Sequence, residues 1–198
     1  MNGWLRERYG DPCRECGFSW ESPETASAHE IIARSPERFE RVVSSRSGTE
    51  HIPRLKWSVA AYVAHVADNT RIWAERLATG ALGGALRIAT YDEALLGRAR
   101  NYCDLSLTGC LWSLRRSVED WESVWSLDPT AAVVLDHPEQ GPLSSGAVAS
   151  IVAHEVVHHA GDVEAILGGC AALPGQAADP LNWADPKAKI PPSAATSQ

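Results

Sequence analysis

Residues 147–167, AVASIVAHEVVHHAGDVEAIL, have the pattern of one long amphipathic helix, and this stretch decides the fold. Its large apolar residues recur at the spacing of a single helical face. Ser144 or Ser145 can cap the start of the helix, and Gly168-Gly169 ends it. Within about two and a half turns, the helix carries several metal-binding side chains: His154, Glu155, His158, His159 and Asp162. The stretch therefore predicts a metal site.

Helical periodicity separates these side chains into two groups. At about 100° per residue, His159 lies within roughly 20° of the centre of the apolar face, and Glu155 within about 50°. His158 lies about 110° and His154 about 150° from that centre. Glu155 and His159, one turn apart, are therefore expected to face the core, where they are costly unless paired or metal-bound. The pattern favours metal ligation; a His–Glu hydrogen bond in the core is the alternative.

The same helix also contains a competing motif, because residues 154–158 read H-E-V-V-H. In the zinc metalloproteases with this spacing, the two histidines bind zinc and the glutamate activates water. Glu164 is the only glutamate after the motif and would be the third ligand. Met1 is the only methionine, so a Met-turn is excluded. Because the two motif histidines point away from the apolar face, the sequence favours the Glu155–His159 pair over the protease motif.

Composition limits the class of protein. The 198 residues suit one domain, and the net charge of −7 argues against nucleic acid or an anionic membrane surface as a partner. No apolar run approaches a transmembrane span, and the N-terminus MNGWLRERYG lacks the apolar core of a signal peptide. The five cysteines, an odd number, favour reduced thiols and a cytoplasmic location. A small molecule is the expected substrate, and a homodimer is the assembly considered.

Residues 1–21 are expected to form a polar N-terminal arm that carries Cys13-Arg14-Glu15-Cys16. A C-x-x-C pair is half of a zinc site or a redox dithiol. No second such pair follows, and Cys103 and Cys110 have the wrong spacing for a zinc knuckle. Three interpretations stay open: a structural metal bound through Cys13 and Cys16, a redox pair, and a free pair on a docked arm.

Three further helical stretches precede the decisive one. They are residues 22–43, with a restart capped by Ser35, residues 57–79, and residues 92–126, with a break near Asp104. Residues 127–143 contain three prolines and are expected to be loop with at most a short strand, and residues 169–198 an irregular Pro/Ala-rich tail. Four long helical segments with little strand pattern predict an all-α four-helix bundle over residues 22–168.

The helix over residues 57–79 contributes one more candidate ligand, His65. It lies on the flank of the apolar stripe, about 105° from its centre, so periodicity alone leaves it open whether it is a ligand or an ordinary boundary histidine. Asp68, one turn later, can orient its ring. The apolar stripe itself consists of Val59, Tyr62, Val63, Val66, Trp73 and Leu77.

The segment WSVAAYVAHVAD, in which His65 follows Trp57 by eight residues, resembles the second helix of the DinB-like superfamily. That superfamily includes the mycothiol-dependent maleylpyruvate isomerases. The segment EVVHHAGD resembles their later helix, which carries E/H-x-x-x-H. The resemblance implies a four-helix bundle whose metal ligands are His65, Glu155 and His159, a set closer to the isomerase branch than to the three-histidine branch.

Three protein ligands leave a metal with an open position, as in catalytic zinc sites, and zinc is the expected ion. We expect at least one of Asp68, His158 and Asp162 to orient a ligand. The resemblance implies a low-molecular-weight thiol such as mycothiol as cosubstrate, and hence a thiol S-transferase or thiol-dependent isomerase acting on a small electrophile. The alternatives are a Lewis-acid enzyme without a thiol, a sulfur supplied by the cysteines of the arm, and a non-catalytic metal-binding protein.

Overall fold

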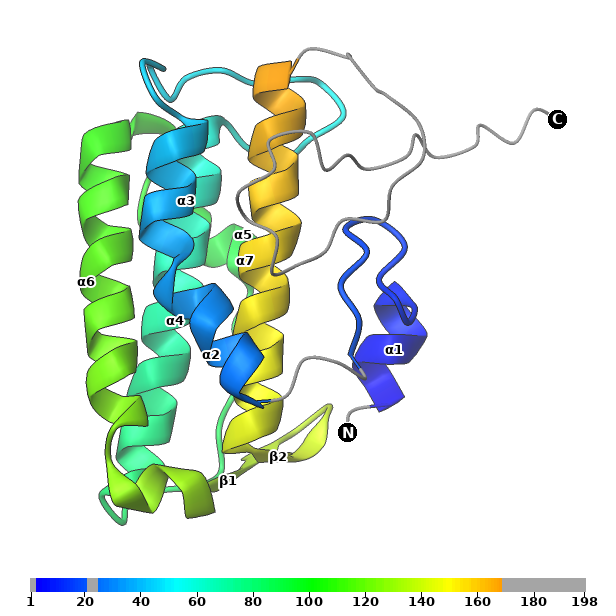
Figure 1. Ribbon diagram of the computed structural model, residues 1–198, viewed down its shortest axis with the longest axis vertical. Helices are drawn as coiled ribbons and strands as arrows, with labels where there is room; N and C mark the ends of the chain where they lie inside the picture. The colour runs from blue at the N-terminus through cyan, green and yellow to red at the C-terminus, as the bar shows by residue number, and fades with distance from the viewer. Residues whose placement is uncertain (1–2, 21–24, 169–198) are drawn as a thin grey trace, which may run out of the picture.

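The computed structural model describes residues 3–20 and 25–168, and Figure 1 shows their arrangement. The helices are α1 (Gly3–Tyr9), α2 (Thr25–Ala33), α3 (Ser35–Val42), α4 (Val59–Ala81), α5 (Glu93–Ala99), α6 (Leu107–Trp125) and α7 (Ser145–Gly168). Two 3-10 helices, η1 (Tyr102–Asp104) and η2 (Asp128–Ala132), and the strands β1 (Val134–His137) and β2 (Gly141–Ser144) complete the order. The predicted tail and the predicted helix start at Ser22 lie outside the described residues.

The helices α2 with α3, α4, α6 and α7 form the four-helix bundle that the sequence predicts, so the predicted all-α fold is confirmed. The helix α4 packs against α6 and α7, α2 lies on α7, and α3 contacts both α6 and α7 (Figure 1). Each of these helices buries an apolar face toward the others, which is the condition for a bundle with one shared core. The decisive helix α7 is thus in contact with three others, α2, α3 and α4.

The first helix of the bundle is interrupted once, at Arg34. The sequence predicts Ser35 as the cap of α3, but Ser35 is already helical, and Arg34 occupies the N-cap position without a side-chain hydrogen bond. The backbone of Arg34 keeps a right-handed helical conformation, with φ −88° and ψ −1°. The interruption is therefore a kink between two helical pieces, and no capping side chain is needed there.

The helix α4 is the central element of the bundle. It begins at Val59, because the hydroxyl of Ser58 accepts a hydrogen bond from the backbone N–H of Ala61 at 3.4 Å. Every residue from Val59 to Thr70 is buried, including His65, whose exposed fraction is 0%. Periodicity predicts His65 at a boundary, and this expectation is wrong because neighbouring elements cover α4 on all its sides in this part.

The predicted helix over residues 92–126 is divided by a longer break than expected. The helix α5 begins at the cap Asp92, whose carboxylate accepts from the backbone N–H of Leu95 at 2.9 Å. After α5, Asn101 adopts a left-handed backbone with φ +53°, which turns the chain into η1. The hydroxyl of Ser106 then caps α6 by accepting from the N–H of Gly109 at 3.2 Å. The predicted break near Asp104 extends from Arg100 to Ser106, except for η1.

Two strands occur where the sequence predicts at most one. β1 and β2 pair antiparallel, with Leu135 opposite Leu143, and both of these side chains are fully buried. Gly141, the first residue of β2, follows the turn between the strands and has φ +70°, a conformation that glycine adopts without strain. The hairpin closes the lower end of the bundle in Figure 1 and leads directly into α7.

Residues 3–20 form the arm, which packs on the face of α7 that the bundle leaves uncovered (Figure 1). The sequence predicts a polar arm, but Leu5, Phe18 and Trp20 are buried, and so are both cysteines. These apolar side chains cover α7, and this contact makes the arm part of the folded core. None of the described helices combines the length and apolar character that a membrane crossing needs.

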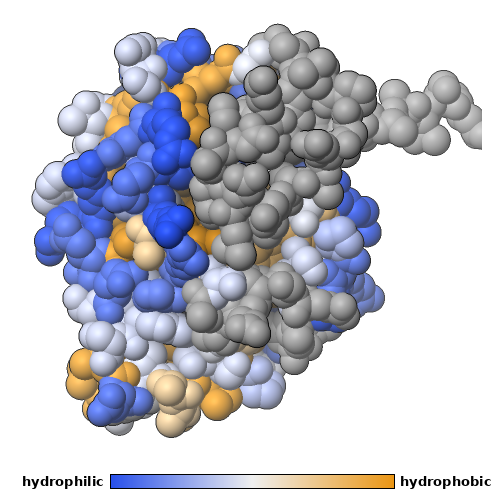
Figure 2. All heavy atoms as spheres, in the orientation of Figure 1, coloured by the Kyte–Doolittle hydropathy of each residue, from blue (hydrophilic) through white to orange (hydrophobic). Residues whose placement is uncertain are grey.

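The outer surface of the bundle has the polarity expected of an amphipathic packing. Figure 2 shows mainly hydrophilic atoms over α3, whose Phe39 is fully buried on the opposite side. On the same helix, Glu40 forms two hydrogen bonds of 2.6 Å with Arg115 of α6. Burial and surface charge thus agree on which face of α3 points inward.

Candidate metal centre

Three predicted ligands meet between α4 and α7, and we call them the inner cluster: His65, Glu155 and His159. Glu155 Oε2 lies 3.2 Å from His65 Nε2 and 3.3 Å from His159 Nε2. One ligand atom from each residue lies within 4.8 Å of the other two. Two helices that are far apart in the sequence thus bring two imidazoles and a carboxylate to one point.

Asp162 positions the ring of His159. Its Oδ2 lies 2.9 Å from His159 Nδ1, which turns Nε2 toward Glu155. Burial lowers the pKa of His159, but Asp162 and then Glu155 outweigh burial and raise it to about 9. A carboxylate on the far nitrogen is the usual way in which a metal-binding histidine is held in one orientation.

The chemistry of the inner cluster fits a divalent ion. Burial disfavours the ionised carboxyl of Glu155, yet His154, His159 and His65 hold its pKa well below the usual range, so it is an anion. Nδ1 of His65 is buried and has no hydrogen-bond partner among the described residues, so only Nε2 takes part in the cluster. Two histidines and a glutamate form the ligand set of one type of catalytic zinc site.

Asp68 lies elsewhere than the sequence analysis expects. Its Oδ2 accepts a hydrogen bond from the hydroxyl of Tyr102 at 2.7 Å and lies 2.8 Å from Arg100 Nε. The ring of His65 makes no hydrogen bond to it within the described chain, because Nε2 faces Glu155 and Nδ1 has no partner. The carboxylate therefore holds η1 onto α4, which corrects the expectation that it orients His65.

Two aromatic rings that the sequence analysis did not assign to the site lie against the inner cluster. The Trp57 ring centre is 4.9 Å from that of His65, and the Tyr62 ring centre is 5.2 Å from that of His159. Burial, and then the charge of Asp162, raise the pKa of Tyr62 to about 12, so its hydroxyl stays protonated. Both rings restrict rotation of the histidines. Trp57 precedes His65 by eight residues and Tyr62 precedes it by three, and this spacing could have identified both rings in the sequence.

The other two histidines of α7 lie in a second group of ligand-type side chains, which we call the outer cluster: Cys13, Cys16, His154 and His158. One ligand atom from each lies within 4.8 Å of the others. Periodicity predicts that His154 points away from the core, yet it is only 1% exposed. The reason is the arm, which covers this face of α7.

The protease motif is not assembled in the structure. His154 and His158 do meet, but Glu155 places its Oε2 in the inner cluster. Glu164, the third ligand that this motif requires, forms an ion pair with Arg38 at 2.7 Å. The described residues therefore hold an inner and an outer cluster in place of one protease site, and a third group, His158, His159 and Asp162, lies where the two adjoin.

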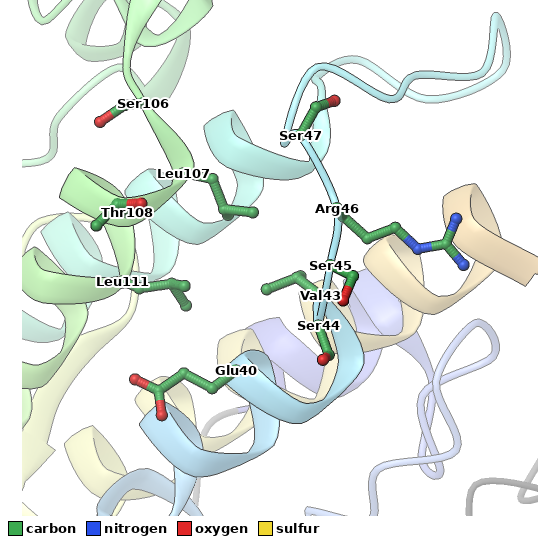
Figure 3. Close-up of a pocket in the computed structure, with 10 residues that line it drawn as sticks. All are labelled: Glu40, Val43, Ser44, Ser45, Arg46, Ser47, Ser106, Leu107, Thr108 and Leu111. Atoms are coloured by element: carbon green, nitrogen blue, oxygen red, sulfur yellow. The ribbon is translucent and has the colours of Figure 1, made fainter.

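A surface hollow lies apart from both clusters, between the end of α3 and the start of α6 (Figure 3). It has a volume of about 430 Å³ and is lined by Val43, Leu107, Leu111 and the serines of the 44–47 loop, with Glu40 at one edge. None of the residues of the two clusters lines it. The hollow is therefore not part of the candidate centre.

Comparisons with known proteins agree with the helical-bundle fold. The solved structure described as "YfiT from Bacillus subtilis is a probable metal-dependent hydrolase with an unusual four-helix bundle topology" is similar to this chain with a TM-score of 0.60 and 17% sequence identity. The similarity covers 73% of this chain and 87% of that one. No curated protein matches the chain. The family model of the DinB superfamily matches residues 6–163, and the chain belongs to that superfamily.

Proposed function

We propose that this protein is a metal-dependent enzyme that binds one divalent ion, zinc, through His65, Glu155 and His159. The observation that carries the proposal is the position of Glu155 Oε2, 3.2 Å and 3.3 Å from the Nε2 atoms of two buried histidines. The ligands are supplied by two long helices, whose backbone positions are held by the packing of the bundle. Such a site needs little reorganisation when the ion enters.

Three protein ligands leave a coordination position for an exogenous group, which is the mark of a catalytic site. When bound, the ion supplies a positive charge that lowers the pKa of a water or thiol at that position. The chain itself orients the ligands: Asp162 holds His159 at 2.9 Å, and Trp57 and Tyr62 restrict the two imidazoles. Contacts of 3.2 Å to His65 and 3.3 Å to His159 hold Oε2 of Glu155 at the site.

The first candidate reaction is attack of a low-molecular-weight thiol, of the mycothiol type, on a small electrophilic molecule. It rests on the resemblance of the His65–Glu155–His159 set to that of the thiol-dependent isomerases. Such a step forms a bond from sulfur to the electrophilic carbon and releases the thiol proton. In an S-transfer a leaving group departs with the electron pair, and in an isomerisation the thiol is expelled again. The arm cysteines lie with His154 and His158, which argues against their use as the attacking sulfur.

The second candidate reaction is hydrolysis, in which water takes the place of the thiol. The observation that favours it is the fold similarity to a probable metal-dependent hydrolase. Both candidates use the same ion and the same three ligands, so they differ only in the nucleophile. One assay can therefore separate them.

The test measures turnover of a panel of small epoxides, aryl halides, maleyl compounds and esters by zinc-loaded protein, with and without added thiol. Thiol consumption that depends on enzyme and on zinc would support the thiol reaction, and ester cleavage that needs no thiol would support hydrolysis. His159→Ala should abolish either reaction, and His51→Ala, at an exposed histidine outside both clusters, serves as the control. A His159→Ala protein that binds as much zinc as the unmodified chain and turns over equally fast would refute the proposal.

A further inference from the structure

The outer cluster has the composition of a zinc site and the geometry to become one. Its four ligand atoms lie within 4.8 Å of one another. With bonds of about 2.3 Å to sulfur and 2.0 Å to nitrogen, a tetrahedral zinc ion places its ligand atoms roughly 3.3–3.8 Å apart. An ion therefore needs to draw these side chains together by about 1 Å, which is within the reach of rotamer adjustment.

Each histidine of the outer cluster has a carboxylate near one of its ring nitrogens. His154 Nδ1 lies 3.6 Å from Glu155 Oε1, and His158 Nε2 lies 3.3 Å from Glu15 Oε2. The remaining nitrogens, His154 Nε2 and His158 Nδ1, are buried, and neither has a hydrogen-bond partner in the described part of the chain. A buried, unpaired imidazole nitrogen is costly, and a metal ion removes the cost.

The backbone around the two cysteines is arranged to receive a metal. Cys13 N–H donates to the Phe18 carbonyl at 2.7 Å, and Gly17 N–H donates to the Cys13 carbonyl at 2.8 Å. Gly17 has φ +75°, and this left-handed residue closes the turn directly after Cys16. The amides of Cys16 and Phe18 lie in hydrogen-bond reach of the Cys13 and Cys16 sulfurs, respectively. Amide donors in these positions suit sulfur ligands of a metal.

The surroundings of the outer cluster are closed and apolar. The rings of Trp20, Tyr9 and Phe18 lie 4.6, 4.9 and 5.6 Å from the ring of His154. Cys13 is 2% and Cys16 8% exposed, and both are free thiols. A site with four protein ligands and no open side is typical of structural zinc and unlike a catalytic centre.

We propose that Cys13, Cys16, His154 and His158 bind a second, structural zinc ion that fastens the arm to α7. The sulfurs come from the arm and the nitrogens from α7, so the ion joins segments that are about 140 residues apart in the chain. The inner cluster is not required for this site, and the two proposals can fail separately. The H-x-x-x-H spacing within the apparent protease motif thus serves structure in place of catalysis.

The test loads the full-length, reduced protein with zinc and, in parallel, with cobalt, whose bonds to thiolate give a charge-transfer absorption in the near ultraviolet. The unmodified chain should bind about two zinc ions and show that absorption with cobalt. Cys13→Ser/Cys16→Ser should lose about one zinc ion and the whole absorption band. The matched control, Cys103→Ser/Cys110→Ser, should keep both ions and the band.

A measurement on one cluster alone keeps the test valid if the cysteine variant does not fold. His159→Ala with zinc should retain about one ion, and X-ray absorption should find sulfur at about 2.3 Å and nitrogen at about 2.0 Å. A cobalt spectrum of the unmodified chain without a thiolate band would overturn the proposal. So would a band that survives Cys13→Ser/Cys16→Ser, or protein that holds a Cys13–Cys16 disulfide and excludes zinc at this cluster even after reduction.

If His159→Ala retains both ions and the band, the inner site fails while the outer site stands. If the chain binds a single ion without a thiolate band, the outer site fails while the inner site stands. Chelation offers an independent readout, because removal of the outer ion should expose the arm. Limited proteolysis should then cut residues 3–20 faster, and restored zinc should reverse the effect.

Discussion

The two sides of α7 carry two clusters that contain different types of ligand side chain. The inner side meets α4 and gathers two imidazoles and a carboxylate, whereas the outer side meets the arm and gathers two imidazoles and two thiols. Three ligands of mixed oxygen and nitrogen leave room for a substrate, and four ligands with two sulfurs do not. One helix thus supplies side chains to both clusters, and the partner segment decides whether the ligand set is of the catalytic or the structural type.

The largest effect that separates the two clusters is expected on turnover. His159→Ala should lower the activity of the proposed enzyme roughly a thousandfold or more, because the ion supplies several kcal/mol of transition-state stabilisation. The thiolate band of the cobalt protein should remain. His154→Ala should do the reverse, keeping the inner ion and losing most of the band. If His154→Ala removed the inner ion and His159→Ala did not, the comparison between the clusters would be wrong.

A second prediction concerns the packing that supports the outer cluster. Phe18 is fully buried, and its ring lies 5.2 Å from Trp20 and 5.6 Å from His154. Phe18→Ala should destabilise the docked arm by about 3–5 kcal/mol, the range for a buried phenylalanine. Hydrogen exchange of residues 3–20 measures this loss. Trp112→Ala, at a side chain that is 66% exposed, should change stability by less than about 0.5 kcal/mol.

A third prediction separates the carboxylates behind the two clusters. Asp162→Asn should weaken zinc at the inner cluster about 10–100-fold, because Asp162 holds His159 at 2.9 Å. The outer cluster should be unaffected, as judged by competition with a chelator. Equal losses at both clusters would show that the variant disturbs α7 as a whole.

The smallest effect is expected at Glu15. It lies 3.3 Å from His158, but its side chain is 76% exposed, so water competes with the contact. Glu15→Gln should weaken zinc at the outer cluster less than about tenfold and leave the inner cluster unchanged. A loss as large as that of Asp162→Asn at the inner cluster would mean that the exposed carboxylate orients His158 as firmly as a buried one.

The sequence was sufficient for the bundle and for the inner face of α7. Apolar spacing places Glu155 and His159 inward, and both are found between α4 and α7. Apolar spacing could not place His65, because it identifies one buried face of a helix, whereas α4 is buried on all sides from Val59 to Thr70. The resemblance to the superfamily supplied that residue, because it compares whole segments with a known arrangement.

The outer cluster was not predicted for a different physical reason. The contact between the arm and α7 joins residues 13 and 154, and no local pattern reports a contact over such a separation. Helical periodicity places His154 on the face of α7 that points away from the bundle, and here the arm covers that face. The two halves of the cluster were each visible in the sequence: the C-x-x-C pair left a structural metal open among three interpretations, and the H-x-x-x-H spacing was part of the protease motif.

The shared carboxylate of Glu155 has a consequence for how this chain can diverge. Its Oε2 faces the inner cluster and its Oε1 faces His154, so a change at Glu155 is felt on both sides of the helix. Relatives that lose the two arm cysteines should also replace His154 and His158. Histidines on a face of α7 that no arm covers are not buried and contribute no stability there. Those relatives should still keep His65, Glu155 and His159. Substitutions in the inner and outer clusters should therefore occur independently among relatives, except at Glu155, whose carboxylate contacts both clusters.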